Sequence, residues 1–224
     1  MQLIWLRSDL RQSDNTALSA AVKRGPTVAV YLISPQQWLS HDDAACKVDF
    51  WLRNLATLSD SLQALNIPLL IRTADTWDQA PAVLLELCQQ HGIEAVHANQ
   101  EYGINETRRD EAAAKALEAQ GIEFHSYLDQ LLFQPGTVLT QSGTYFQVFS
   151  QFRRICYNHL HRALPPIVES PQAQTAVTIE RDAIPQSVDG FIQPTESLRA
   201  LWPAGERHAQ QRLAHFADEQ IHYY

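Results

Sequence analysis

The stretch "IEAVHANQEYGINETRRDEAAAKALEAQGIEFHSYL", residues 93–128, contains one complete unit of alternating secondary structure. The apolar run over 93–98 predicts a strand. The Ala-rich run over 106–121 predicts a helix that ends at a glycine, and the run over 122–128 predicts a second strand. Two strands joined through a helix run parallel in one sheet. The stretch therefore indicates an α/β fold.

The same alternation continues toward the N-terminus. Three more strands are predicted at 2–7, 27–33 and 68–74, and three more helices at 13–25, 43–65 and 82–92. The helix over 13–25 has Asp14 or Asn15 as its expected N-cap and Gly25 just past its end. Five strands that alternate with helices predict a doubly wound, five-stranded parallel sheet.

The pattern changes after residue 130. A short helix is expected at 152–164, and the proline-containing stretch over 165–194 is expected to be a long linker that lies over a surface. A last helix is expected at 205–221, with Leu213 and Phe216 on its apolar face. This face lies just before the end of the chain, so we expect that the sequence is truncated or that a missing partner covers the face.

Composition limits the class of protein. Hydrophobic residues make up 45 % and charged residues 19 % of the chain, which predicts a folded core. Cys46, Cys88 and Cys156 lie far apart, and we interpret them as reduced thiols. The sequence shows neither a signal peptide nor a membrane span, so a soluble cytoplasmic protein is expected. The net charge of −8 argues against a protein that binds nucleic acid mainly through phosphates, although a local basic patch can be hidden in such an average.

Several common motifs are missing. The sequence contains no G-x-G-x-x-G, no G-x-x-x-x-G-K-[ST] and no G-x-S-x-G, which disfavours simple NAD dehydrogenases, P-loop enzymes and α/β-hydrolases. His208, His215 and His222 recur every seven residues, about 10 Å apart on a helix, and this spacing is too wide for one metal ion. His159 and His161 are expected to be solvated. We predict no metal site.

Ligands of parallel α/β sheets bind outside the carboxyl ends of the strands. Three polar segments follow predicted strands and should meet at that edge: "RSDLRQSDN" (7–15), "SPQQWLSHDD" (34–43) and "NQEYGINE" (99–106). We therefore expect a ligand site between these segments.

In the second segment, His41, Asp42 and Asp43 precede the long helix. The simpler interpretation is that this segment caps the helix and places acidic residues near its positive end. A role in binding a ligand is the alternative, and the two are compatible because a capping loop can also line a pocket.

The third segment has the same two interpretations. Asn105 is expected to cap the following helix, with Glu106 in its first turn. Alternatively, the amide and the carboxylate together hold the amino and ring N–H donors of a heterocycle such as a pterin. Tyr102 and Trp38 would then supply flat faces beside the ring.

Five segments resemble one family. "WLRSDLRQSDNTAL" (5–18) resembles the opening signature of the DNA photolyase and cryptochrome family, W-F-R-x-D-L-R-x-x-D-N-x-A-L, with Leu6 in place of the usual Phe. Similar resemblances, in the family's order, are found in "ISPQQWLSHD" (33–42), "NQEYGINETRRD" (99–110), "GTYFQVFSQFRR" (143–154) and "LWPAGERHAQQRLAHF" (201–216). The second and third of these five segments are similar to the folate-type class I photolyases.

The resemblance implies a deoxyribodipyrimidine photolyase, which is a monomer at full length. Residues 1–130 would form a Rossmann-like domain that binds the antenna 5,10-methenyltetrahydrofolate. Residues 131–194 would form an irregular segment and linker, and residues 195–224 would begin a truncated all-α domain that binds FAD and damaged DNA. Reduced flavin would split a cyclobutane pyrimidine dimer that is flipped out of the duplex. The fragment alone is expected to be inactive in repair.

The resemblance also assigns site residues. Asn105 and Glu106 match the family's pair of antenna contacts, and His41 matches a loop position near the chromophore. Tyr224 matches a tyrosine that contacts the FAD phosphates, and Gly103 stands where the family commonly has Glu. No catalytic residue is expected in this chain. Two alternatives stay open: a cryptochrome-type blue-light receptor, and a non-enzymatic nucleotide-binding α/β module.

Overall fold

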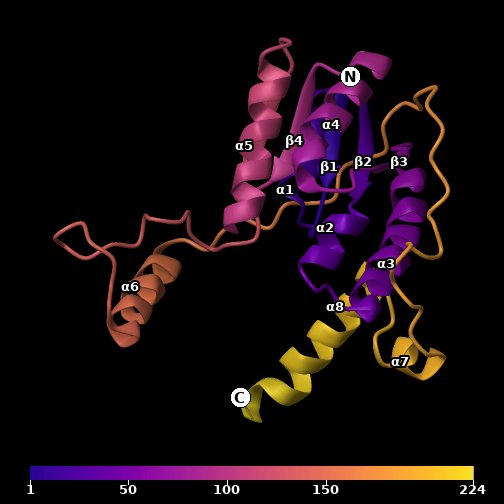
Figure 1. Ribbon diagram of the computed structural model, residues 1–224. Coiled ribbons are helices and arrows are strands. Elements are labelled where there is room, and N and C mark those ends of the chain that lie inside the picture. The colour runs from indigo at the N-terminus through magenta and orange to yellow at the C-terminus, as the bar shows by residue number, and fades with distance from the viewer. Residues whose placement is uncertain (224) are drawn as a thin grey trace.

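The computed structural model describes residues 1–223 and contains one five-stranded sheet with helices on both faces (Figure 1). All strands run parallel in the order β3-β2-β1-β4-β5. Their bounds are β1 Gln2–Leu6, β2 Thr27–Ile33, β3 Leu69–Thr73, β4 Ala95–Asn99 and β5 Glu123–Tyr127. The predicted doubly wound parallel sheet is confirmed.

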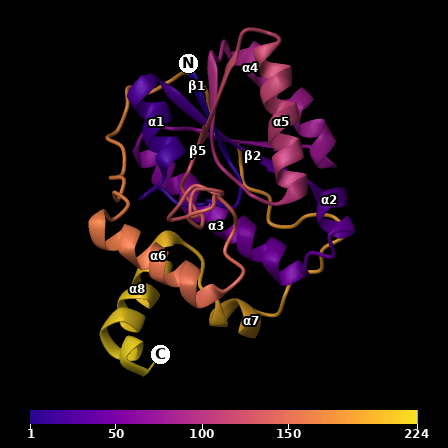
Figure 2. The same cartoon turned by 90° about the vertical axis from the view of Figure 1, so that its left-hand side faces the viewer.

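Two apolar cores lie on opposite faces of the sheet. Because successive side chains of a strand point to opposite faces, Leu3 and Trp5 of β1 join one core while Ile4 and Leu6 join the other. Helices α4 and α5 cover the first face, and α1 and α3 cover the second (Figure 2). The helices span α1 Thr16–Arg24, α3 Ala45–Ala64, α4 Ala80–His91 and α5 Ile104–Glu118.

The strand order reverses at the centre of the sheet. The chain moves outward from β1 through β2 to β3 and then returns through α4 to β4, which pairs with the other side of β1. The loops after β1 and β4 therefore diverge toward opposite faces. Such a reversal opens a crevice at the carboxyl edge, where ligands of this fold class bind.

A buried polar network holds the turn after β1 against β4. Asn99 donates from Nδ2 to Asp9 Oδ2 at 2.6 Å and to Asn15 Oδ1 at 2.9 Å, while its Oδ1 accepts from the backbone N–H of Ala17 at 2.9 Å. Asn15 Oδ1 also accepts from the N–H of Leu18 at 3.0 Å and so caps α1. Asn15 is thus confirmed as the N-cap, and the "SDLRQSDN" signature has a structural role in this fold.

The segment before the long helix differs from the prediction. Residues Pro35–Ser40 form a short helix, α2, that begins with proline at a position where the missing N–H costs nothing. Helix α3 then begins after its N-cap, Ala44, which makes no side-chain cap bond. The first turn of α3 contains no acidic residue. The predicted capping by the His41–Asp43 segment is therefore wrong. Asp42 has a φ of 58° in the turn between the helices, and Asp43 pairs with Lys47 at 2.6 Å.

The start of α5 also differs. Gly103 is the N-cap, so the helix begins two residues earlier than expected and Asn105 lies inside its first turn. The prediction that Asn105 is the N-cap is therefore wrong. Glu106 lies in the first turn, as predicted, near the positive end of the helix.

The rest of the chain forms smaller helices and an irregular segment. Helix α6 covers Phe149–Arg162, and α8 covers Glu206–His215 before a π-helical turn at Phe216–Gln220 and a 3-10 turn at Ile221–Tyr223. Regular α-helix thus ends earlier than the expected residue 221. Helix α7, Glu196–Leu201, was not predicted.

Residues 163–195 contain no helix or strand. They begin beside the turn after β1, where the Asp14 backbone N–H donates to the Val168 carbonyl at 2.9 Å, and reach the outer edge of the sheet at β3. The Asp182 backbone N–H donates to the Leu69 carbonyl at 2.9 Å, and the Asp182 carboxylate pairs with Arg72 at 2.6 Å. Nearer the N-terminal end of this stretch, Gln174 hydrogen-bonds the backbone of Thr27 and Asn66. Among residues 1–223, no helix has the length and apolar character needed to cross a membrane.

Candidate functional site

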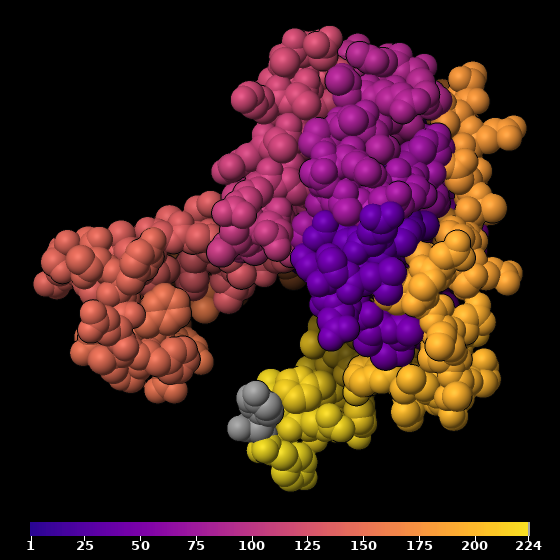
Figure 3. Space-filling model, viewed as in Figure 1, coloured from indigo at the N-terminus to yellow at the C-terminus, as the bar shows by residue number. Residues whose placement is uncertain are grey.

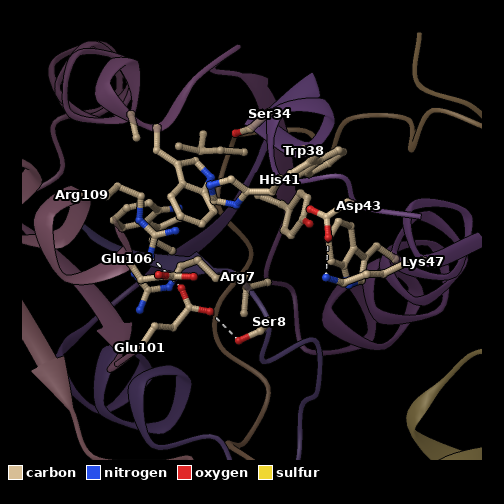
Figure 4. Close-up of a pocket in the computed structure, with 17 residues that line it drawn as sticks. Arg7, Ser8, Ser34, Trp38, His41, Asp43, Lys47, Glu101, Glu106 and Arg109 are labelled. Atoms are coloured by element: carbon tan, nitrogen blue, oxygen red, sulfur yellow. Dashed lines mark hydrogen bonds and ion pairs between the residues drawn. The ribbon is translucent and has the colours of Figure 1, made fainter. Parts of the chain in front are cut away.

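A cavity of about 290 Å³ lies at the carboxyl edge of the sheet (Figure 4). Residues that follow β1, β2 and β4 line it, together with residues of α2, α3 and α5. These are the three segments that the sequence predicted to meet. Figure 4 shows Glu101, Glu106 and Arg109 on one side of the cavity, and Asp43 and Lys47 on the other.

Four tryptophans line the cavity: Trp5, Trp38, Trp51 and Trp77. Trp38 and Trp51 contact each other with ring centroids 5.1 Å apart. The His41 ring meets Trp77 edge-on, with centroids 5.1 Å apart and an interplanar angle of 87°. Such walls suit a flat, aromatic ligand, because they supply both large apolar contact area and faces for stacking.

A buried arginine holds two of these aromatic residues together. The Arg109 guanidinium lies 4.8 Å from the Trp5 ring centroid and 4.9 Å from that of Trp77, so it is placed between them. It pairs with Glu101 at 2.7 Å and with Asp110 at 2.8 Å. Burial works against the charge, but the two carboxylates outweigh it and raise the pKa of Arg109. The guanidinium is thus a fixed part of the cavity wall.

Glu101 is the carboxylate that this wall neutralises. It accepts a hydrogen bond from the Ser8 hydroxyl at 2.6 Å in addition to its ion pair with Arg109. Burial favours the neutral acid, yet the charges of Arg7 and Arg109 and the bonds from Arg109 and Ser8 prevail and lower the pKa of Glu101. Glu101 is therefore ionised, and each of its carboxylate oxygens already accepts a hydrogen bond inside the protein.

Glu106 differs from the other cavity carboxylates. Asp43 is paired with Lys47 and Glu101 with Arg109, but Glu106 has no hydrogen-bond or ion-pair partner within residues 1–223. Its carboxylate folds back over Gly103, whose missing side chain leaves the space for it. A free carboxylate beside aromatic walls can accept two hydrogen bonds from a ligand that carries adjacent N–H donors.

Gln37 on α2 fixes His41. Its Nε2 amide donates to His41 Nε2 at 2.9 Å, and its Oε1 accepts from the backbone N–H of Trp77 at 3.1 Å. His41 Nε2 is thus an acceptor, which places the proton of the neutral ring on Nδ1. This leaves the Nδ1–H of His41 as a donor.

The structure brings together some of the predicted site residues. His41 and Glu106 line the same cavity, as does Trp38, whereas Asn105 and Tyr102 are exposed and are not among the lining residues. Tyr224 lies outside the described residues.

Sequence reasoning missed most of the cavity wall. Trp5, Arg7 and Arg109 lie within segments that resemble the family, but none of them was assigned as a ligand contact, and Trp77 lies in no such segment. The spacing in the sequence could have identified Arg109 as a site residue, because it lies three residues after Glu106 and therefore on the same helix face. Trp77 lies in the connection between β3 and α4, which was not among the three predicted segments.

Comparison with known proteins agrees with this fold. The sequence model of the family described as DNA photolyase matches residues 2–172. The chain belongs to the DNA photolyase family. Members of this family use flavin and folate-type chromophores, and the matched region includes the whole sheet and the cavity.

Individual photolyases and their relatives align at moderate identity. A deoxyribodipyrimidine photo-lyase of Vibrio cholerae is 38 % identical over 155 residues, which cover 69 % of this chain and 33 % of the relative. The crystal structure of a class III photolyase from Agrobacterium tumefaciens superposes with a TM-score of 0.79 at 26 % identity, covering 97 % of this chain and 44 % of that one. The chain thus spans less than half the length of these photolyases.

A shorter relative also matches. An uncharacterized 31.6 kDa protein of Synechococcus is 33 % identical over 227 residues, which cover 100 % of this chain and 77 % of that protein. The region that this chain shares with the photolyases above therefore also occurs within a relative that is much shorter than they are.

Proposed function

We propose that residues 1–130 bind the antenna chromophore of a deoxyribodipyrimidine photolyase, and that this chromophore is 5,10-methenyltetrahydrofolate. The observation that carries the proposal is the unpartnered Glu106 carboxylate at the edge of a cavity with four tryptophans. A pterin presents amino and ring N–H donors that a carboxylate can accept, and its flat ring suits aromatic walls. A volume of about 290 Å³ lies at the lower end of the usual range for ligand pockets, roughly 300 Å³ and upward.

We assign His41 and Asn105 to the rim of the same site. His41 offers its Nδ1–H toward ligand acceptors, and the exposed Asn105 offers an amide one residue before Glu106. When bound, the folate would supply light absorption. The protein's own task is to hold the ring, orient it and exclude water from it.

Circular dichroism and absorption spectroscopy test whether the chain binds the folate. We expect added 5,10-methenyltetrahydrofolate to bind with an induced circular-dichroism signal and a shift of its absorption band, whereas ATP produces no competition. Glu106→Gln and His41→Ala should each weaken the affinity, and Asn105→Ala should weaken it less. The control Glu111→Gln removes an exposed carboxylate from the same helix and should leave binding unchanged. Preferential binding of ATP that none of these changes affects would instead support a nucleotide-binding module.

We further propose that the activity belongs to a longer protein. In this proposal residues 131–194 act as linker, and residues 195–224, including Tyr224, begin a helical domain that holds FAD and damaged DNA. The test is light-dependent loss of cyclobutane thymine dimers by a version extended to the length of the photolyase relatives and loaded with both cofactors. Cofactor binding without any repair would instead favour a cryptochrome-type photoreceptor.

A further inference from the structure

Helix α6 presents one continuous polar face. Six exposed side chains follow one another at steps of three, one, three, one and three residues, which places them on one side of a helix: Ser150, Arg153, Arg154, Tyr157, Asn158 and His161. The first five of them line a common hollow in the surface. The polar residues are therefore gathered on one surface.

The charge of this face is not neutralised inside the protein. Arg153, Arg154 and the nearby Arg162 have no hydrogen bond or ion pair with any of residues 1–223, whereas Arg7 and Arg109 of the α/β domain are paired with carboxylates. The surrounding stretch of residues 130–168 contains no Asp or Glu, although the net charge of the chain is −8. A local basic surface is thus present within an acidic protein.

The polar face is directed away from the protein. On the other side of α6, Phe152 contacts Phe146 at a centroid distance of 6.2 Å, and His159 contacts Phe133 at 5.9 Å. Both partners belong to the segment that leads into the helix. Figure 3 shows residues 131–165 as an arm that projects from the α/β body. Residues of the arm thus contact one side of α6, although that side is not buried, and the arginines are left free for a partner.

We propose that this face of α6 binds the backbone of DNA. Arginine is suited to phosphate because its planar guanidinium can donate two parallel hydrogen bonds, and Ser, Asn and Tyr are common phosphate contacts. Tyr157, which is 56 % exposed, adds a flat surface on which an unpaired base can stack. An anionic membrane is the competing partner, since interfacial helices insert an apolar face and Phe149 and Phe152 stay 72 % and 37 % exposed. The polar face with its tyrosine favours DNA, and vesicle binding is one outcome of the test below.

This inference rests on the proposed function for its choice of DNA, and it deepens that proposal by placing a DNA contact within this chain. The contact lies on an arm outside the α/β domain. The proposed DNA contact can therefore be disproved while the antenna proposal holds, and the antenna proposal can be disproved while the DNA contact holds. An assay without chromophore and without light separates the two.

The experiment measures fluorescence anisotropy of labelled duplex and single-stranded DNA between about 20 and 200 mM salt. We expect weak, salt-dependent binding by the wild-type chain. Arg153→Ala combined with Arg154→Ala should reduce the magnitude of the slope of log K against log salt by about 2 for the duplex. The matched control Lys23→Ala/Lys115→Ala removes two exposed cations from α1 and α5, and it should leave the slope unchanged.

A second variant tests stacking. Tyr157→Ala should weaken binding of the single strand about fivefold or more while affecting the duplex less, because only unpaired bases offer free faces. Lack of binding at the lowest salt would overturn the proposal. So would an equal loss in the lysine control, self-association through α6, or binding to phosphatidylserine vesicles without binding to DNA.

Discussion

The carboxylate of Glu106 occupies the space that a side chain at position 103 would need. A Cβ on Gly103 would overlap this carboxylate, with the Glu106 Cδ atom 2.7 Å away. Gly103 has an extended backbone with a φ of −67°, so any residue can adopt its conformation. The glycine therefore matters here because of the room it leaves for Glu106.

Gly103→Ala should displace the Glu106 carboxylate and weaken folate binding. The displaced group is the end of a flexible side chain, so the free energy of unfolding should change by about 1 kcal/mol or less. Titration with 5,10-methenyltetrahydrofolate and urea unfolding measure the two effects. If Gly103→Ala acts through Glu106, its effect on affinity should largely disappear in a Glu106→Gln background, whereas additive effects would contradict the argument.

Glu101→Gln should destabilise the protein by about 3 kcal/mol at neutral pH, because it removes a buried partner of Arg109. The pKa of Glu101 is lowered in the folded state, so its contribution is present above the unfolded pKa and is lost as the pH falls through the folded pKa. The difference between wild type and variant should therefore shrink in acid. Urea unfolding at pH 7 and at about pH 3 measures this difference, and a constant difference would contradict it.

His97 should make the protein sensitive to mild acid. It is fully buried on β4, where Nε2 faces Gln2 Oε1 at 2.9 Å and Nδ1 accepts from the Tyr127 hydroxyl at 2.8 Å. Burial, assisted by His125 and Arg24, lowers the pKa of His97 to about 4. The unfolded chain binds this proton from about pH 6.5, so unfolding free energy should fall by up to about 3 kcal/mol between pH 6.5 and 4.

The His97→Asn variant provides the control for this titration. It lacks the titrating group, so its unfolding free energy should depend less on pH over the same range even though its stability is lower throughout. Urea unfolding at intervals of about one pH unit compares the two proteins. Parallel curves for the variant and wild type would show that other groups cause the acid sensitivity.

Asn99→Ala should disrupt the signature turn. The change removes the donor to Asp9 and Asn15 and the acceptor of the Ala17 N–H, all of them buried. Unsatisfied buried groups of this kind cost about 1–3 kcal/mol each, so a total loss of roughly 2–4 kcal/mol is expected in urea unfolding. Asn66→Ala, in the turn that precedes β3, is a comparison outside this network, and it should cost less.

The sequence predicted the sheet well because its three central strands, β1, β2 and β4, are buried along their whole length. The continuous apolar run of β2 and the helices that end at glycines on either side of β4 leave little room for another fold. Helix α2 was missed because its pattern is short and begins at a proline. The cap of α5 was misassigned because Asn105 is a good capping residue, and nothing local indicated that Gly103 would leave space for Glu106.

The cavity was only partly predictable, because some of its residues are placed by sheet topology and others by tertiary packing. Strand order placed His41 and Glu106 at one edge, because that follows from topology. The position of Arg109 beside Trp5 depends on packing between residues that are 104 positions apart in the sequence. Its contact with Trp77 involves a connection that carries no motif. Tertiary packing of this kind leaves no periodic pattern in the sequence.

Glu206 should anchor α8 to the same signature loop. Its carboxylate accepts from the backbone N–H groups of Gln12 at 2.8 Å and Ser13 at 3.1 Å, while the N–H of the preceding Gly205 donates to Asn54 Oδ1 on α3 at 2.9 Å. Helix α8 is otherwise exposed, with no buried residue. The first turn of α8 is therefore held mainly by these polar contacts.

Glu206→Ala should release both backbone donors to water. We expect faster hydrogen exchange at the amides of Gln12 and Ser13 and along the first turn of α8, with unchanged exchange in β1 and β4, because local opening does not require unfolding of the sheet. Global stability should fall by less than about 2 kcal/mol, since water can replace the lost acceptor. Glu219→Ala, which changes an exposed carboxylate beyond α8, is the control. Equal exchange in wild type and Glu206→Ala would show that the contact between α3 and Gly205 is sufficient to hold the helix.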